Sequence, residues 1–176
     1  QSNEWDSNKT LEWELLEESS HAQLHEFFRS INQFYKKTPP LWENDFSWDG
    51  FEWISNDDNE QGVISFRRKG ADGKEILVVC NFLPVQRENY KIGAPWAGIY
   101  TEIFSSDDKA FGGTGITNGD EIKSEKGAMH GFDQHISLTL PGNTVIFLKC
   151  RRKYPVRKKT LTASAKAEKA EKKSEK

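Results

Sequence analysis

The residues of this chain best suited to acid–base chemistry are its paired carboxylates. They are Glu17-Glu18, Asp57-Asp58 and Asp107-Asp108. Two carboxyl groups held about 5 Å apart can cleave and re-form a glycosidic bond, one as nucleophile and the other as acid and base. Adjacent residues, however, point to opposite faces of a strand, and carboxylates in loops mostly face water. We therefore expect these pairs to be solvated and predict no catalytic residue in the chain.

The histidines give little indication of a metal or nucleophilic site. His21 and His25 lie one helical turn apart and could share a metal ion, but no third ligand accompanies them. We expect both to face solvent. His130 and His135 have no Ser, Cys or Asp partner at a spacing typical of catalysis. The sequence thus predicts neither a metal site nor a cofactor.

The glycine-rich segment Phe111-Gly112-Gly113-Thr114-Gly115 could suggest a phosphate-binding loop. Such a loop needs a following Gly-Lys-Ser/Thr and a helix whose amino terminus faces the anion, and this sequence has neither. Because glycine reaches positive φ angles without steric cost, a tight turn explains the composition. We expect a turn-forming loop.

Composition indicates one folded domain with appendages. The chain has 176 residues, of which 35% are hydrophobic, and its aromatic residues include eleven Phe and six Trp. This length suits a single domain, and large aromatic side chains can build its core. Cys80 and Cys150 lie in apolar runs without the spacing of a zinc site, so we expect buried thiols. The sequence shows neither a 20-residue apolar stretch nor a signal peptide, which favours a soluble cytoplasmic protein and no membrane partner.

Charge is divided unevenly along the chain. Residues 149–176 carry a net charge of +9, whereas residues 1–148 carry −11. An acidic body repels phosphate backbones, so we expect no nucleic-acid partner for it. The tail is rich in Ala, Lys, Glu and Ser and cannot bury enough apolar surface to offset its ordering entropy. We predict that residues 151–176 form a disordered basic tail.

The periodicity of apolar residues predicts one helix followed by strands. Residues 19–37 place five apolar side chains on a single stripe, with Ser20 and Gln23 as a capping box and Pro39-Pro40 as the stop. The state of residues 11–16 stays open. Strands are expected at 51–54, 63–68, 75–82, 89–92, 98–104, 122–124, 134–140 and 144–149. Many short strands separated by turn residues predict an antiparallel β-sandwich.

Several segments together resemble the carboxy-terminal end of 1,4-α-glucan branching enzymes, in the α-amylase superfamily. They are Asn3-Glu4-Trp5-Asp6, Leu11-Glu12-Trp13-Glu14-Leu15-Leu16, Gly50-Phe51-Glu52-Trp53-Ile54, Asn81-Phe82-Leu83-Pro84-Val85, Phe111-Gly112-Gly113-Thr114-Gly115, His130-Gly131 and His135-Ile136-Ser137-Leu138-Thr139-Leu140-Pro141. The resemblance covers residues 3–149. It implies that residues 1–40 end a catalytic (β/α)₈ barrel, including its last helix, and that residues 41–150 form the family's all-β carboxy-terminal domain.

The resemblance also implies a function for the parent protein. Branching enzymes cut an α-1,4-glucan and transfer the chain to a 6-hydroxyl, as transglycosylases of glycogen biosynthesis. Their catalytic carboxylates lie on barrel strands that this sequence lacks, so we expect the chain alone to be inactive. Its expected partners are α-glucan and the missing catalytic barrel, against which the glycine-rich loop could pack. A stand-alone carbohydrate-binding module and an interaction module with a basic docking tail remain alternatives.

Tryptophans are the candidate glucan-binding residues, since an indole can cover the apolar face of a sugar. Trp13 and Trp53 lie in apolar runs and are expected in the core, and Trp5 in the barrel remnant. Trp48 and Trp96 lie in turn-rich stretches, where exposure is expected. We predict that one of these two forms a glucan-binding platform.

The apolar stripe of the helix would lack its barrel partner in this chain. Phe27 and Phe28 lie on that stripe. We expect this surface to make the isolated chain self-associate, or to draw the helix against the sandwich.

Overall fold

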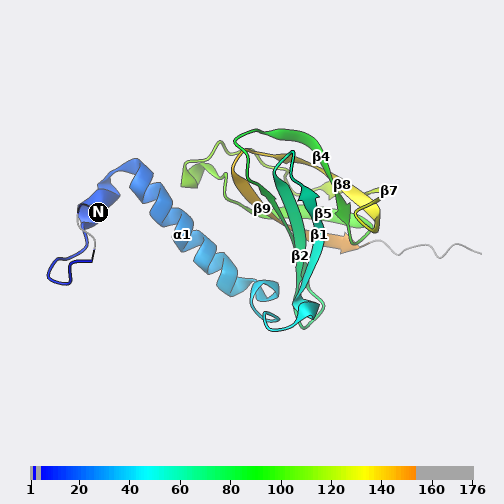
Figure 1. Cartoon of the computed structure of the whole chain (residues 1–176), viewed down its shortest axis with the longest axis horizontal. Helices are drawn as coiled ribbons and strands as arrows, with labels where there is room; N and C mark the ends of the chain where they lie inside the picture. The colour runs from blue at the N-terminus through cyan, green and yellow to red at the C-terminus, as the bar shows by residue number, and fades with distance from the viewer. Residues whose placement is uncertain (1, 3–4, 154–176) are drawn as a thin grey trace, which may run out of the picture.

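The computed structural model describes residue 2 and residues 5–153, and shows a helix lying beside a β-sandwich (Figure 1). Most of the predicted basic tail therefore lies outside the described residues. Residues 151–153 are an exception, because the last strand extends through them. Within the described chain no helix is both long and apolar enough to cross a membrane.

Helix α1 (Ser19–Lys37) has the bounds that the sequence predicted. The open segment before it is a 3-10 helix, η1 (Trp13–Glu17). The predicted capping box was wrong: Glu18 has extended backbone angles and takes the N-cap position, and no described side chain caps the helix. Ser20 consequently lies inside the first turn rather than before it. After Thr38, η2 (Pro39–Leu41) redirects the chain towards the sandwich.

Antiparallel pairing arranges the described strands in two sheets. The larger sheet has six strands in the order β1-β2-β3-β9-β5-β6, and the smaller has three in the order β4-β8-β7. Their bounds are β1 (Phe51–Asp58), β2 (Val63–Lys69), β3 (Glu75–Asn81), β4 (Arg87–Ala94), β5 (Gly98–Ser105), β6 (Ile122–Lys123), β7 (Glu125–Met129), β8 (Phe132–Leu140) and β9 (Thr144–Lys153). The predicted mainly-β sandwich is confirmed.

Strand β7 is the one strand of the described chain that the sequence did not predict. Its residues are exposed except Met129, so it lacks the apolar alternation that marks a half-buried strand. It pairs with β8 through a turn at His130 and Gly131, which both have positive φ angles. Two consecutive residues of this kind give the turn type that fits the twist of a hairpin.

The core lies between the two sheets, and β3 is buried on both of its faces. Leu77 and Val79 point inwards and meet residues of β4 and β8. Ile76 and Val78 point outwards and form a second cluster with Phe147. Phe34 of helix α1 and Leu41 of η2 pack against this cluster, which explains why β3 shows no alternation of apolar and polar residues.

The contact between helix and sandwich is aromatic. The Phe34 ring lies 4.9 Å from that of Phe104 and 5.0 Å from that of Phe147, measured between centroids. The Phe27 ring lies 5.4 Å from that of Phe111. The helix thus packs on the outer face of the larger sheet, over β9 and β5, while Phe28 stays 56% exposed. Self-association of the chain stays a prediction.

Candidate functional site

A cluster of three aromatic rings, of which one is exposed and two are half-buried, lies on the outer face of the larger sheet at the β1 edge. Phe51 and Trp53 share the outer face of edge strand β1, and Phe66 lies opposite Trp53 on β2. The ring centroids of Phe51 and Phe66 are stacked 5.2 Å apart, and Trp53 meets the rings of Phe51 and Phe66 edge-on at 4.9 and 5.8 Å. We call these three residues the aromatic surface.

Trp53 was expected in the core, and this prediction was wrong. Its side chain is 47% exposed because β1 is an edge strand, with a neighbouring strand on one side only. The sequence pattern could have predicted this exposure, since residues 51 and 53 must share one face of the strand and Ile54 points to the other, buried face. Trp13 is also exposed, contrary to expectation, because η1 contributes no buried residue. Trp5, expected in the barrel remnant, is fully exposed in this chain.

Trp48 and Trp96 lie at the same end of the sandwich, where β1 and β5 begin. Trp48 is 90% exposed in η3 (Trp48–Gly50), and Trp96 is 38% exposed in the turn between β4 and β5. Four strand-to-strand steps separate β1 from β5, which corresponds to roughly 19 Å at the usual spacing of neighbouring strands. The structure therefore does not bring the two indoles together as one platform.

The turn that carries Trp96 is held rigidly by a buried tyrosine. The Tyr100 hydroxyl accepts a hydrogen bond from the Trp96 backbone N–H and donates one to its carbonyl oxygen, both at 3.0 Å. Tyr100 is fully buried, and burial raises the pKa of its hydroxyl. This phenol keeps its proton and fixes the turn, so the Trp96 ring sits on a defined backbone.

One of the acidic residues expected to be solvated is buried instead. Asp107 accepts hydrogen bonds from the backbone N–H groups of Thr114 and Ile116 at 2.9 and 3.1 Å and from the Thr114 hydroxyl at 2.5 Å. Burial alone would raise the pKa of Asp107, but these hydrogen bonds outweigh it and lower the pKa below its ordinary value. The glycine-rich loop is thus folded around its own carboxylate, as a turn and not as an anion cradle.

Two glutamates of the larger sheet also converge, but around an arginine. Arg67 contacts Glu52 at 2.7 Å and Glu75 at 3.0 Å, and its guanidinium lies over the Phe132 ring. Burial would raise the pKa of Glu52, yet hydrogen bonds from Arg67 and Lys69 hold it below the ordinary value. Glu52 therefore stays ionised at neutral pH, unlike the protonated acid that glycosidic cleavage requires.

His21 and His25 are exposed on α1, as predicted, whereas His130 and His135 make contacts within the smaller sheet. His135 lies between Glu125 and the Gly127 carbonyl, at 3.4 and 3.3 Å, and His130 accepts the Gly93 N–H. No group of three or more His, Cys, Asp or Glu among the described residues could hold a metal ion. Neither cysteine forms a disulfide, and burial raises the pKa of Cys80 to about 11.

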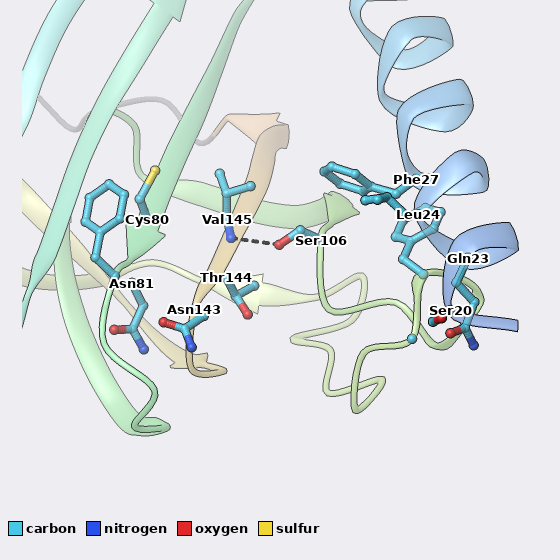
Figure 2. Close-up of a pocket in the computed structure, with 13 residues that line it drawn as sticks. Ser20, Gln23, Leu24, Phe27, Cys80, Asn81, Ser106, Asn143, Thr144 and Val145 are labelled. Carbon is cyan, nitrogen blue, oxygen red and sulfur yellow. Dashed lines mark hydrogen bonds between the residues drawn. The ribbon is translucent and has the colours of Figure 1, made fainter. Parts of the chain in front are cut away.

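A groove of about 760 Å³ runs between the amino-terminal half of α1 and the end of the larger sheet where β3 ends and β9 begins (Figure 2). The rings of Phe27, Phe82 and Phe111 contribute to its lining. Asn143, in the turn before β9, lies across the groove from Ser20 and Gln23 of the helix (Figure 2). Sequence reasoning missed this groove, because its walls come from four separate segments.

The fold defines an antiparallel β-sandwich domain that presents aromatic side chains. The family model described as "Alpha amylase, C-terminal all-beta domain" matches residues 53–151, and the chain belongs to this family.

Three relatives carry the same name, 1,4-alpha-glucan branching enzyme GlgB. The protein from Francisella philomiragia is 43% identical over 85% of this chain, that from Aquifex aeolicus 44% over 83%, and that from Rubrobacter xylanophilus 40% over 86%. The matches cover 24%, 23% and 21% of those proteins. The chain thus spans about a quarter of the length of the curated relatives it matches.

Proposed function

We propose that this chain is the carboxy-terminal part of a 1,4-α-glucan branching enzyme of glycogen biosynthesis. In the parent, α-1,4-glucan is cleaved and the released chain is transferred to a 6-hydroxyl. The observation that carries the proposal is identity of 40–44% to branching enzymes across 83–86% of the chain. The chain itself supplies structure and glucan contacts, and its parent supplies the chemistry.

We further propose the domain division 1–40, 41–150 and 151–176, with the first segment belonging to the catalytic barrel. The family match begins at Trp53, after α1, which supports a boundary between helix and sandwich. Leu24, Phe28 and Tyr35 are exposed apolar residues of α1, and Leu24 also lines the groove beside the sandwich. In the parent these residues pack against the barrel; without the barrel they are the surface for self-association.

The aromatic surface is a further candidate glucan contact, made through its exposed Trp53 ring. Its three rings lie on a sheet, so their positions are fixed before any ligand arrives. Trp48 and Trp96 stay proposals as separate, single-ring contacts. A stand-alone carbohydrate-binding module is the second candidate, favoured by the same exposed rings. The unpaired thiol of Cys80 supports a cytoplasmic location, where disulfides are rare.

Branching assays of a chimera test the proposal. In the enzyme of Aquifex aeolicus, the segment matched by this chain is replaced with residues 1–153, and amylose is incubated with the chimera or with the chain alone. New α-1,6 linkages are measured from the chain lengths released by a debranching enzyme. We expect branching by the chimera and none by the chain. A folded but inactive chimera, or branching by the chain alone, would contradict the proposal.

A further inference from the structure

The groove between α1 and the ends of β3 and β9 differs from the rest of the protein in its charge. None of the 13 described residues that line it is charged, whereas 30% of the whole sequence consists of Asp, Glu, Lys and Arg. An ionic ligand such as a phosphate or an acidic peptide would find no counter-charge there. A neutral ligand is the chemical class that this lining fits.

Neutral hydrogen-bonding groups stand at the edge of the groove. They are the hydroxyl of Ser20 and the carboxamides of Gln23 and Asn143, and no other described residue engages these side chains in a hydrogen bond. Each can donate and accept, which is the pattern that sugar hydroxyls require. Ser106 and Thr144 differ, because their hydroxyl oxygens already bond Val145 N and Gly142 O.

The local fold explains why an aromatic ring is presented at this position. Strand β3 ends at the buried Asn81, whose carboxamide donates to the carbonyls of Val85 and Pro141, both at 2.8 Å. This ties two turns together immediately after the strand, and Phe82 is left 63% exposed beside the groove. Asn143 lies in the adjoining turn with a positive φ of 51°, a conformation that asparagine tolerates.

We propose that this groove is a second glucan-binding site, which holds a short segment of a neutral α-glucan chain against Phe82 and Phe111. Its volume of about 760 Å³ falls within the usual range of ligand pockets, roughly 300–1,000 Å³. The rings cover the apolar faces of the sugars, and Gln23 and Asn143 bond the hydroxyls from opposite walls. This inference rests on the proposed function, because that function supplies glucan as the partner.

Titration of the 176-residue chain with maltoheptaose by calorimetry tests the site. Phe82→Ala should weaken binding about tenfold, because it removes one ring from the site. Asn143→Asp should weaken it as well, because it places a charge in a neutral groove while keeping a residue that tolerates positive φ. Val85→Ala is the matched control, since Val85 is exposed on the same turn but does not line the groove. Circular dichroism checks that all variants fold.

The proposal is overturned if Phe82→Ala and Asn143→Asp bind like Val85→Ala, or if the unmodified chain shows no saturable binding. A loss confined to Trp53→Ala would assign the affinity to the aromatic surface instead. If Phe82→Ala disrupts dimers in the analytical ultracentrifuge and leaves maltoheptaose affinity unchanged, the groove is a protein contact and the inference fails. None of these results alters the branching assay of the chimera, so the two proposals fail independently.

Discussion

The docking of helix α1 on the sandwich can be tested with two phenylalanines of the same helix. Phe34 packs against Phe104 and Phe147, whereas Phe28 is 56% exposed. Replacing a fully buried Phe with Ala costs about 3–5 kcal/mol, and Phe34 is only partly buried, so we expect Phe34→Ala to lower the unfolding free energy by about 2–3 kcal/mol. Phe28→Ala should lower it by less than about 1 kcal/mol.

Urea unfolding followed by circular dichroism and tryptophan fluorescence measures both variants. Because the helix and the larger sheet share one apolar cluster, the two signals should change together in the unmodified chain. Equal effects of the two substitutions would refute the docking geometry. Separate transitions for helix and sandwich would refute their cooperativity, and with it the walls of the proposed groove.

Three further substitutions probe the loop and the aromatic surface. Because folding lowers the pKa of Asp107, its carboxylate contributes its full stabilisation above about pH 3.8, the ordinary pKa of the group, and loses it as the pH falls through the folded-state pKa. Asp107→Asn should therefore flatten the acid side of a plot of unfolding free energy against pH. An unchanged acid side would contradict this. A Cβ at Gly113 would lie 2.1 Å from the backbone carbonyl oxygen of Asp107, whereas a Cβ at Gly73 would meet open space, with only its positive φ as a cost. Gly113→Ala should therefore lower the thermal unfolding midpoint more than Gly73→Ala. The reverse order would contradict the loop geometry. Trp53→Ala should reduce retention of the chain on amylose gels with about 1–2 kcal/mol loss of stability, because the ring is about half buried. Unchanged retention of a folded variant would remove the aromatic surface as a platform.

The sequence predicts the elements well wherever apolar periodicity is strong. The stripe from Leu24 to Phe34 and the stop at Pro39-Pro40 define α1 correctly, and the run of β3 indicates a strand buried on both faces. Strand β7 escapes because pairing with β8, and not burial, holds it in place. The capping box fails because the backbone at Glu18 decides where the helix begins.

The candidate site is harder to predict from sequence, because it depends on which faces of the strands are covered by other elements of the fold. Trp53 has an apolar context, yet its exposure follows from the position of β1 at a sheet edge and from α1 lying over β9 and β5. The sequence predicts that Asp107 faces solvent, whereas the structure shows that it accepts hydrogen bonds from the backbone of Thr114 and Ile116. The groove joins Gln23 to Asn143 across 120 residues of chain, a relation that no local pattern contains.

The central claim is that this chain contacts α-glucan without performing chemistry on it. Nuclear magnetic resonance of the isotopically labelled chain with maltoheptaose tests both parts in a single sample. We expect shifts of the Trp53 indole N–H and of the Gln23 and Asn143 side-chain amides, with the sugar signals unchanged over days. Absence of any shift, or the appearance of α-1,6 anomeric signals, would contradict it.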